Sequence, residues 1–194
     1  MDIFAHGLWT GVLYRAANLE RADKKQLRVR WAVFWGVFPD LFAFTIPVAI
    51  LFYGLILGES ELTALPSVHD RTLTGSDHSA QLFQYTHTLY NISHSAVIFL
   101  LTFFIVWFFA KRPVWEMGAW LLHVLIDIPT HSNQFYPTPF LWPVSHFGIN
   151  GFPWASPGFL TVNYLLIAAA YSALYFVRKK IKVRRNRTEK NSTE

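Results

Sequence analysis

The chain has 194 residues, of which 53% are hydrophobic and only 15% are charged. Soluble domains carry about 25% charged residues, so this composition excludes an ordinary soluble domain and favours a membrane protein with several helices. The chain contains no cysteine, which excludes disulfides and thiolate metal sites and leaves histidine and carboxylate side chains as metal ligands. The net charge of +5 does not indicate nucleic-acid binding, because the basic residues flank apolar runs.

Five apolar stretches are separated by polar or basic segments, and we expect each to form a helix. In chain order they are residues 3–19, 31–57, 94–110, 114–128 and 158–177. Pro39 and Pro47 interrupt the second stretch, and prolines in membrane helices often mark a working site. The polar segment 58–92 is predicted to be a loop with a short helix near 79–90, and its histidines are predicted to be solvated. These histidines are His69, His78 and His87.

The basic residues predict an orientation. If the apolar stretches alternate across a membrane, the basic segments 15–30, 111–112 and 178–190 fall on one side. The acidic segment 58–92 and the uncharged aromatic loop 129–157 then fall on the other side. By the positive-inside rule the basic side is cytoplasmic.

The chain is therefore predicted to be an all-α, multi-pass membrane bundle of about four to five helices, with no second domain. The integral-membrane domain is expected at 1–177, and a basic, disordered cytoplasmic tail at 178–194. Five crossings follow only if the first stretch spans the membrane. Lipid is the expected surrounding partner, and the sequence indicates no oligomeric state.

The segment around His123 and Asp127 carries the clearest chemical signal. The two residues are four positions apart, which places both side chains on one helix face. A buried imidazole and a buried carboxylate are costly unless they are paired, and one divalent cation satisfies several such donors at once. His131 follows Pro129, which must end or kink the helix, so a third donor can turn back toward the same place.

Other helices carry donors at a similar depth. Counted from the basic side at about 1.5 Å per residue, His6, Asp40 and His94 lie roughly 15 to 24 Å along their helices, as do His123 and Asp127. Ionisable residues inside a membrane are functional by default. We therefore predict that these five residues form one metal site, with His131 at its rim.

Each residue also has a structural interpretation. His6 alone is more often a helix–helix hydrogen-bonding residue than a ligand. Asp40 after Pro39 is placed to cap a helix that restarts after the proline. His94 is placed to begin a helix at an interface, and His123 with Asp127 is placed to form a structural hydrogen bond.

Short motifs in chain order carry a resemblance that extends to about residue 145. They are His6, Pro39-Asp40, Ser93-His94-Ser95, His123-Val-Leu-Ile-Asp127 and Trp142-Pro143. This ordered set resembles the bacterial family described as membrane-bound metal-dependent hydrolases. The resemblance implies a location in the bacterial inner membrane, and the positive-inside rule applied above predicts a cytoplasmic C-terminus for this multi-pass chain.

That family is distantly similar to zinc-dependent phospholipases C and single-strand-specific zinc nucleases. The similarity implies a ligand series that is filled here by His6, Asp40, His94, His123, Asp127 and His131. Two features depart from it. Leu89-Tyr90-Asn91 stands where a phosphate-binding arginine is expected, and Asn150 replaces the acid that would follow His146. One or two metal ions are therefore expected instead of three.

The leading hypothesis is a hydrolase with one or two divalent ions, expected to be zinc, which lower the pKa of bound water and polarise an ester. Asp40 or Asp127 is the candidate base. The location and the resemblance imply a lipid or lipid-linked phosphoester substrate, and no nucleic-acid partner is expected. The alternative is a non-enzymatic membrane protein, either a scaffold or a metal or proton carrier.

Overall fold

The computed structural model describes residues 1–19, 21, 25–57, 78–133 and 137–191, and the regular structure within these ranges is entirely helical. A short 3-10 helix, Trp115–Met117, accompanies six α-helices. These are α1 (Ile3–Leu19), α2 (Val29–Leu57), α3 (His78–Ser93), α4 (Ala96–Ala110), α5 (Gly118–Thr130) and α6 (Pro157–Asn191). The all-α prediction is confirmed, and α3 is the short helix predicted near 79–90, in addition to the helices expected from the five apolar stretches.

Two of these helices are long and apolar enough to cross a membrane, over Val29–Gly54 in α2 and Pro157–Arg184 in α6. A third candidate is a bent pair, Gln84–Ser93 with Ala96–Ala110, whose two helices are bent by 59°. At 17 and 13 residues, α1 and α5 fall short of the roughly 20 residues that a straight crossing needs. The described residues are therefore compatible with a membrane protein of two or three crossings, fewer than the five expected from apolar stretches alone.

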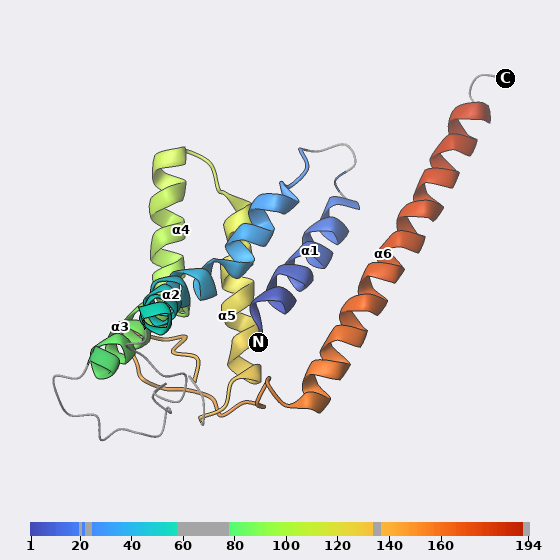
Figure 1. The fold of residues 1–194 in the computed structure, drawn as a ribbon. Helices are drawn as coiled ribbons and strands as arrows, with labels where there is room; N and C mark the ends of the chain where they lie inside the picture. Colours follow the sequence, from blue (N-terminus) through green and yellow to red (C-terminus); the bar gives the residue numbers. More distant parts are fainter. Residues whose placement is uncertain (20, 22–24, 58–77, 134–136, 192–194) are drawn as a thin grey trace.

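The basic C-terminal segment differs from its prediction. Residues 178–191 continue α6 as a helix to Asn191, where a disordered tail was expected. Extending an existing helix avoids the cost of nucleation, and the arginines, lysines and glutamate of this segment are good helix formers. Figure 1 shows α6 running the full height of the molecule, with the C-terminus at the same end as the connector between α1 and α2.

The polar segment after α2 is described only in part. Its predicted short helix is found as α3, and His87 is exposed on that helix. His78 is the first residue of α3, whereas His69 lies outside the described residues.

Glycines let α1 pack closely against α2. A Cβ atom at Gly36 of α2 would overlap the Oγ1 atom of Thr10 on α1, and a Cβ atom at Gly7 would lie 3.2 Å from a methyl group of Val37. Small residues at such crossings let two helix backbones approach each other. The close crossing fixes α1, which carries His6, against α2, which carries Asp40.

An aromatic core holds α5 against the junction between α3 and α4. Phe99, Met117, Trp120 and Val124 form a buried cluster. The indole Nε1–H of Trp120 donates a hydrogen bond of 2.6 Å to the carbonyl oxygen of Ser93, the last residue of α3. The cluster therefore positions both His94, the residue after α3, and His123, one turn further along α5.

The predicted aromatic loop closes the opposite end of the bundle from the connector between α1 and α2 (Figure 1). Its backbone pairs with the end of α5, because Gly151 N–H donates to the His131 carbonyl oxygen at 2.8 Å and Phe152 N–H donates to that of Pro129 at 2.8 Å. A Cβ atom at Gly151 would overlap the Pro129 carbonyl group, so only glycine permits this approach. The loop is thus fixed beside His131.

Replacing Gly36 with alanine is expected to destabilise the fold, because the added methyl group must displace Thr10 at the α1–α2 crossing. Overpacking of this kind typically costs about 1–3 kcal/mol. Thermal unfolding in detergent should show a lower midpoint for Gly36→Ala. Gly158→Ala in α6 is the control, since nothing lies within 4 Å of a Cβ atom there; equal midpoints for the two variants would contradict the close crossing.

Candidate metal site

Four parts of the fold bring histidine and aspartate side chains to one place. His6 comes from α1, Asp40 from α2 and His94 from the break between α3 and α4, while His123 and Asp127 come from α5. We call these five residues the His/Asp cluster. Four of them are at most 1% exposed to solvent, whereas the Asp40 side chain is 14% exposed. The five residues grouped from their depth along the sequence therefore lie together.

The donor atoms of the cluster are closely spaced. His94 Nε2 lies 3.1 Å from His123 Nε2, 3.4 Å from Asp40 Oδ1 and 3.5 Å from Asp127 Oδ2. His123 Nε2 lies 3.1 Å from Asp127 Oδ2 and 3.7 Å from Asp40 Oδ1. Ligands of a tetrahedral ion at about 2.1 Å are roughly 3.4 Å apart, so these distances are in the range of a coordination shell.

Backbone carbonyl groups determine which ring nitrogens face the cluster. His123 Nδ1 lies 2.7 Å from the Gly36 carbonyl oxygen, and His94 Nδ1 lies 3.2 Å from that of Tyr90. A carbonyl oxygen only accepts hydrogen bonds, so His123 Nδ1 carries a proton, whereas His94 Nδ1 also lies 3.0 Å from the Ser93 hydroxyl group, which can donate or accept. When both Nδ1 atoms carry the proton and both rings are neutral, the two Nε2 atoms present the lone pairs that a metal ion requires of its ligands. A second-shell carbonyl on Nδ1 is the usual arrangement for a histidine that binds metal through Nε2.

Asp127 is the most heavily contacted member of the cluster. Its Oδ1 atom accepts a hydrogen bond of 2.9 Å from His6 Nε2. The same oxygen forms an ion pair with the amino group of Met1. The His6 ring stacks on His123, with centroids 3.6 Å apart. Asp127 Oδ2 accepts no hydrogen bond from the described residues, although it faces the Nε2 atoms of His94 and His123. A cation is the partner that satisfies a carboxylate oxygen and two imidazole lone pairs together.

Two overlapping groups of residues could hold a metal ion. One is His6, His123 and Asp127, and the other is Asp40, His94 and His123; in each group the ligand atoms lie within 4.8 Å of one another. Nitrogen and carboxylate donors with no sulfur suit zinc and related divalent ions. The donor set therefore fits the predicted divalent metal. His123 occurs in both groups, so it could ligate an ion in either one.

His131 lies beside these groups and belongs to neither. Its Nε2 atom is 3.7 Å from Asp127 Oδ1 and 3.0 Å from the Met1 amino nitrogen. The hydroxyl group of Tyr90 lies 2.8 Å from its Nδ1 atom. This position agrees with the rim position predicted for His131.

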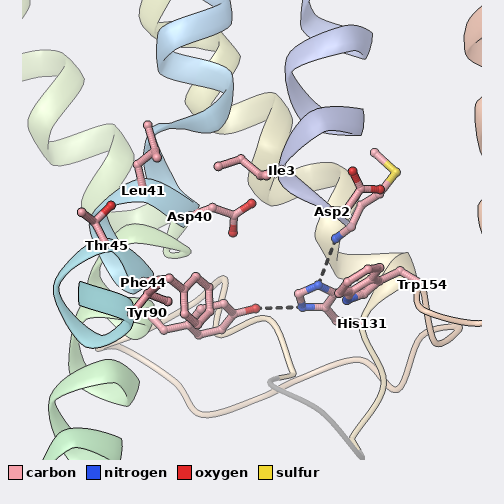
Figure 2. Close-up of a pocket in the computed structure, with 11 residues that line it drawn as sticks. Asp2, Ile3, Asp40, Leu41, Phe44, Thr45, Tyr90, His131 and Trp154 are labelled. Atoms are coloured by element: carbon pink, nitrogen blue, oxygen red, sulfur yellow. Dashed lines mark hydrogen bonds between the residues drawn. The ribbon is translucent and has the colours of Figure 1, made fainter. Parts of the chain in front are cut away.

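A pocket of about 420 Å³ adjoins the cluster at Asp40 and is also lined by His131. Figure 2 shows the Asp40 carboxylate facing the same space as the His131 ring, with the Tyr90 hydroxyl group directed at that ring. The remaining lining is mainly apolar and includes Leu41, Phe44, Val48 and Trp154. The cluster therefore has one partly exposed carboxylate at the edge of an apolar pocket.

Tyr90 is the site residue that the sequence analysis missed. It is 1% exposed, its ring stacks on His94 with centroids 3.8 Å apart, and its hydroxyl group contacts His131. Its spacing could have indicated this contact, because residues four apart on a helix, such as Tyr90 and His94, lie on one face. The carbonyl group of Gly36 carried no such signal, since it acts through the backbone.

Two of the structural interpretations do not fit the fold. Asp40 lies inside α2, which is continuous from Val29 to Leu57, so it caps no new helix. The N-cap of α4 is Ser95, whose side chain accepts from Ile98 N–H, and His94 precedes that cap. The interpretation of His6 as a helix–helix hydrogen-bonding residue remains open, because His6 bonds to Asp127 across α1 and α5.

His146 and Asn150 lie apart from the cluster. Both are exposed, and the Asn150 side-chain oxygen accepts a hydrogen bond from Asn133 N–H at 2.9 Å.

The chain matches no known family model, no curated protein and no solved structure. The interpretation of the site therefore depends on its own geometry.

The purified protein is expected to hold about one or two equivalents of zinc or a similar divalent metal, because the donor set is of that kind. The double variant His123→Ala/Asp127→Ala should lose this metal, since it removes donors from both groups. Elemental mass spectrometry of detergent-purified protein measures the content. His87→Ala, at an exposed position on α3, should retain wild-type content. A wild-type protein without metal after reconstitution would contradict the site.

Proposed function

We propose that this protein is a membrane-embedded, metal-dependent hydrolase that acts on lipid or lipid-linked phosphoesters. The observation that carries the proposal is the arrangement of imidazole nitrogens around Asp127 Oδ2, beside the Asp40 carboxylate at the edge of an apolar pocket. His94 and His123 direct Nε2 toward this oxygen, and Asp40 adds a second carboxylate at 3.4 Å from His94. The resemblance to membrane-bound metal-dependent hydrolases supports the same chemistry.

The two carboxylates receive different roles. A divalent ion held by these donors, zinc in our proposal, supplies Lewis acidity that polarises an ester and lowers the pKa of water. Asp127 is fully buried and contacts His6, His94 and His123, so its role is that of a ligand. Asp40 is partly exposed and lines the pocket, which places it to orient a water molecule and accept its proton.

The pocket supports an amphipathic substrate. On α2, Leu41 and Val48 line the pocket and are 40% and 43% exposed, so in a membrane the pocket would open toward the acyl chains. His131 and the Tyr90 hydroxyl group lie at its polar end. A phosphoester with an apolar body would fit both parts, with the ester near Asp40.

The orientation of the chain is part of the proposal. The pocket lies toward the aromatic loop, at the opposite end of the bundle from the basic connector. By the positive-inside rule the basic end and the C-terminus are cytoplasmic, which places the site on the outer side of a bacterial inner membrane.

A scaffold is the second candidate, and one observation favours it. The hydrogen bonds from His6 to Asp127 and from His123 to the Gly36 carbonyl join three helices without any metal ion. A carrier is less well supported, because Phe99, Met117, Trp120 and Val124 form a buried apolar core beside the cluster and offer no polar route through it.

Conservative substitutions separate the hydrolase from the scaffold. His123→Gln and Asp127→Asn keep hydrogen-bonding groups but weaken metal ligation, so phosphoester turnover should fall by about 10² to 10⁴-fold while the fold is retained. Hydrolysis of a fluorogenic phosphoester panel by detergent-purified protein measures turnover, and a chelator should abolish it. His87→Gln is the matched control. Full activity in the cluster variants would refute the proposal, and hydrolysis of no phosphoester by the metal-loaded wild type would favour the scaffold.

Filling the pocket should alter chain-length preference. Val48→Trp places a large ring in the apolar part of the pocket, so KM is expected to rise more for a long-chain phosphoester than for a short-chain one. Ile50→Trp is the control, because Ile50 is 51% exposed on the same helix and does not line the pocket. Steady-state kinetics with two chain lengths measures the ratio. An unchanged ratio for Val48→Trp would show that substrate does not enter this pocket.

A further inference from the structure

A second pocket, of about 320 Å³, lies at the opposite end of the bundle from the aromatic loop. Three parts of the chain line it: the connector residues 25–28 with Arg21, the start of α2, and the segment 112–116 between α4 and α5. We call it the basic pocket. It shares no residue with the His/Asp cluster or with the pocket beside Asp40.

Cations dominate the lining of the basic pocket. Arg21, Lys25, Arg28 and Arg112 line it, and Glu116 is the single acidic residue among its described lining. Glu116 uses Oε1 to accept a hydrogen bond of 3.0 Å from the backbone N–H of Arg28. Within the described part of the chain, no ion pair within 4.0 Å joins Glu116 to these cations. The pocket therefore presents an excess of positive charge to a ligand.

Hydrogen bonds fix the walls of the basic pocket to one another. The side-chain amide of Asn18 donates to the Leu27 carbonyl oxygen at 2.9 Å and accepts from Leu27 N–H at 2.8 Å. The hydroxyl group of Tyr14 donates to the Trp115 carbonyl oxygen at 2.7 Å. The connector and the α4–α5 segment are thus both tied to α1, so the cations are presented from a defined framework.

The position of the basic pocket relative to the candidate membrane spans indicates which kind of anion it faces. It lies where the candidate span of α2 begins at Val29 and where α4, part of the bent candidate span, has ended at Ala110. Trp31 and Trp115 line it and are 54% and 55% exposed. Exposed tryptophans belong to the headgroup level of a membrane, and basic pockets between membrane helices bind anionic headgroups.

We propose that the basic pocket binds the phosphate group of an anionic phospholipid. Arg28 and Arg112 offer guanidinium groups, which suit phosphate oxygens because they donate paired hydrogen bonds. Trp31 and Trp115 lie along the apolar part of the same lipid. Free phosphate shares the anionic chemistry but would leave these two tryptophans uncovered.

Lipid retention by the purified full-length chain tests this site. Native mass spectrometry after detergent removal should show phosphatidylglycerol retained in preference to phosphatidylcholine. Arg28→Gln/Arg112→Gln should weaken phosphatidylglycerol binding roughly tenfold. The matched control is Lys182→Gln/Arg184→Gln, which removes the same charge from exposed positions on α6. It should bind like the wild type.

Four outcomes would overturn the proposal. They are equal retention of both lipids by the wild type, an equal loss in the α6 control, unchanged binding in the pocket variant, and displacement of the lipid by inorganic phosphate at matched concentration. The wild-type comparison does not depend on how any variant folds. Arg28→Lys/Arg112→Lys adds a milder change that keeps the charge and removes the paired donors, and it should give intermediate binding. None of these measurements involves the metal site, so failure here leaves the proposed hydrolase function untouched.

Discussion

The rest of the structure depends on the close packing of five imidazole and carboxylate side chains, four of which are buried, around one small space. His94 and His123 lie with Nδ1 beside the backbone carbonyl groups of Tyr90 and Gly36, so their Nε2 atoms face each other at 3.1 Å and both face Asp127 Oδ2. Lone pairs crowded in a buried space are unfavourable without a positive partner. The contact of His123 with the Gly36 carbonyl group requires α5 and α2 to approach closely, and the glycine at residue 36 also lets α1 pack closely against α2.

The fold and the site share their supports. Gly36 serves both purposes, because it permits the crossing of α1 over α2 and its carbonyl oxygen orients His123. Trp120 likewise fills the core and bonds to the Ser93 carbonyl group beside His94. The site is thus built on helix positions that packing already fixes, and a change in either crossing would be transmitted to the ring nitrogens.

Much of this arrangement could be predicted from the sequence, since long apolar runs bounded by basic residues are strong signals. Counting residues from the basic ends placed His6, Asp40 and His94 near His123, which the structure brings together. The bend of 59° after α3 could not be counted in that way, and neither could the number of crossings, because α1 and α5 are helical but short. The helical form of residues 178–191 was missed because high charge was taken as disorder, although the segment only extends a helix that already exists.

The unequal exposure of the cluster has a kinetic consequence. Asp40 is its one partly exposed member, while the other four side chains are sealed among helices and beneath the loop paired with the end of α5. Asp40 is the member of the cluster that lines the adjoining pocket. Exchange with the surroundings would then be slow compared with that at an open surface site, and the contents of the cluster would be set largely when the helices assemble.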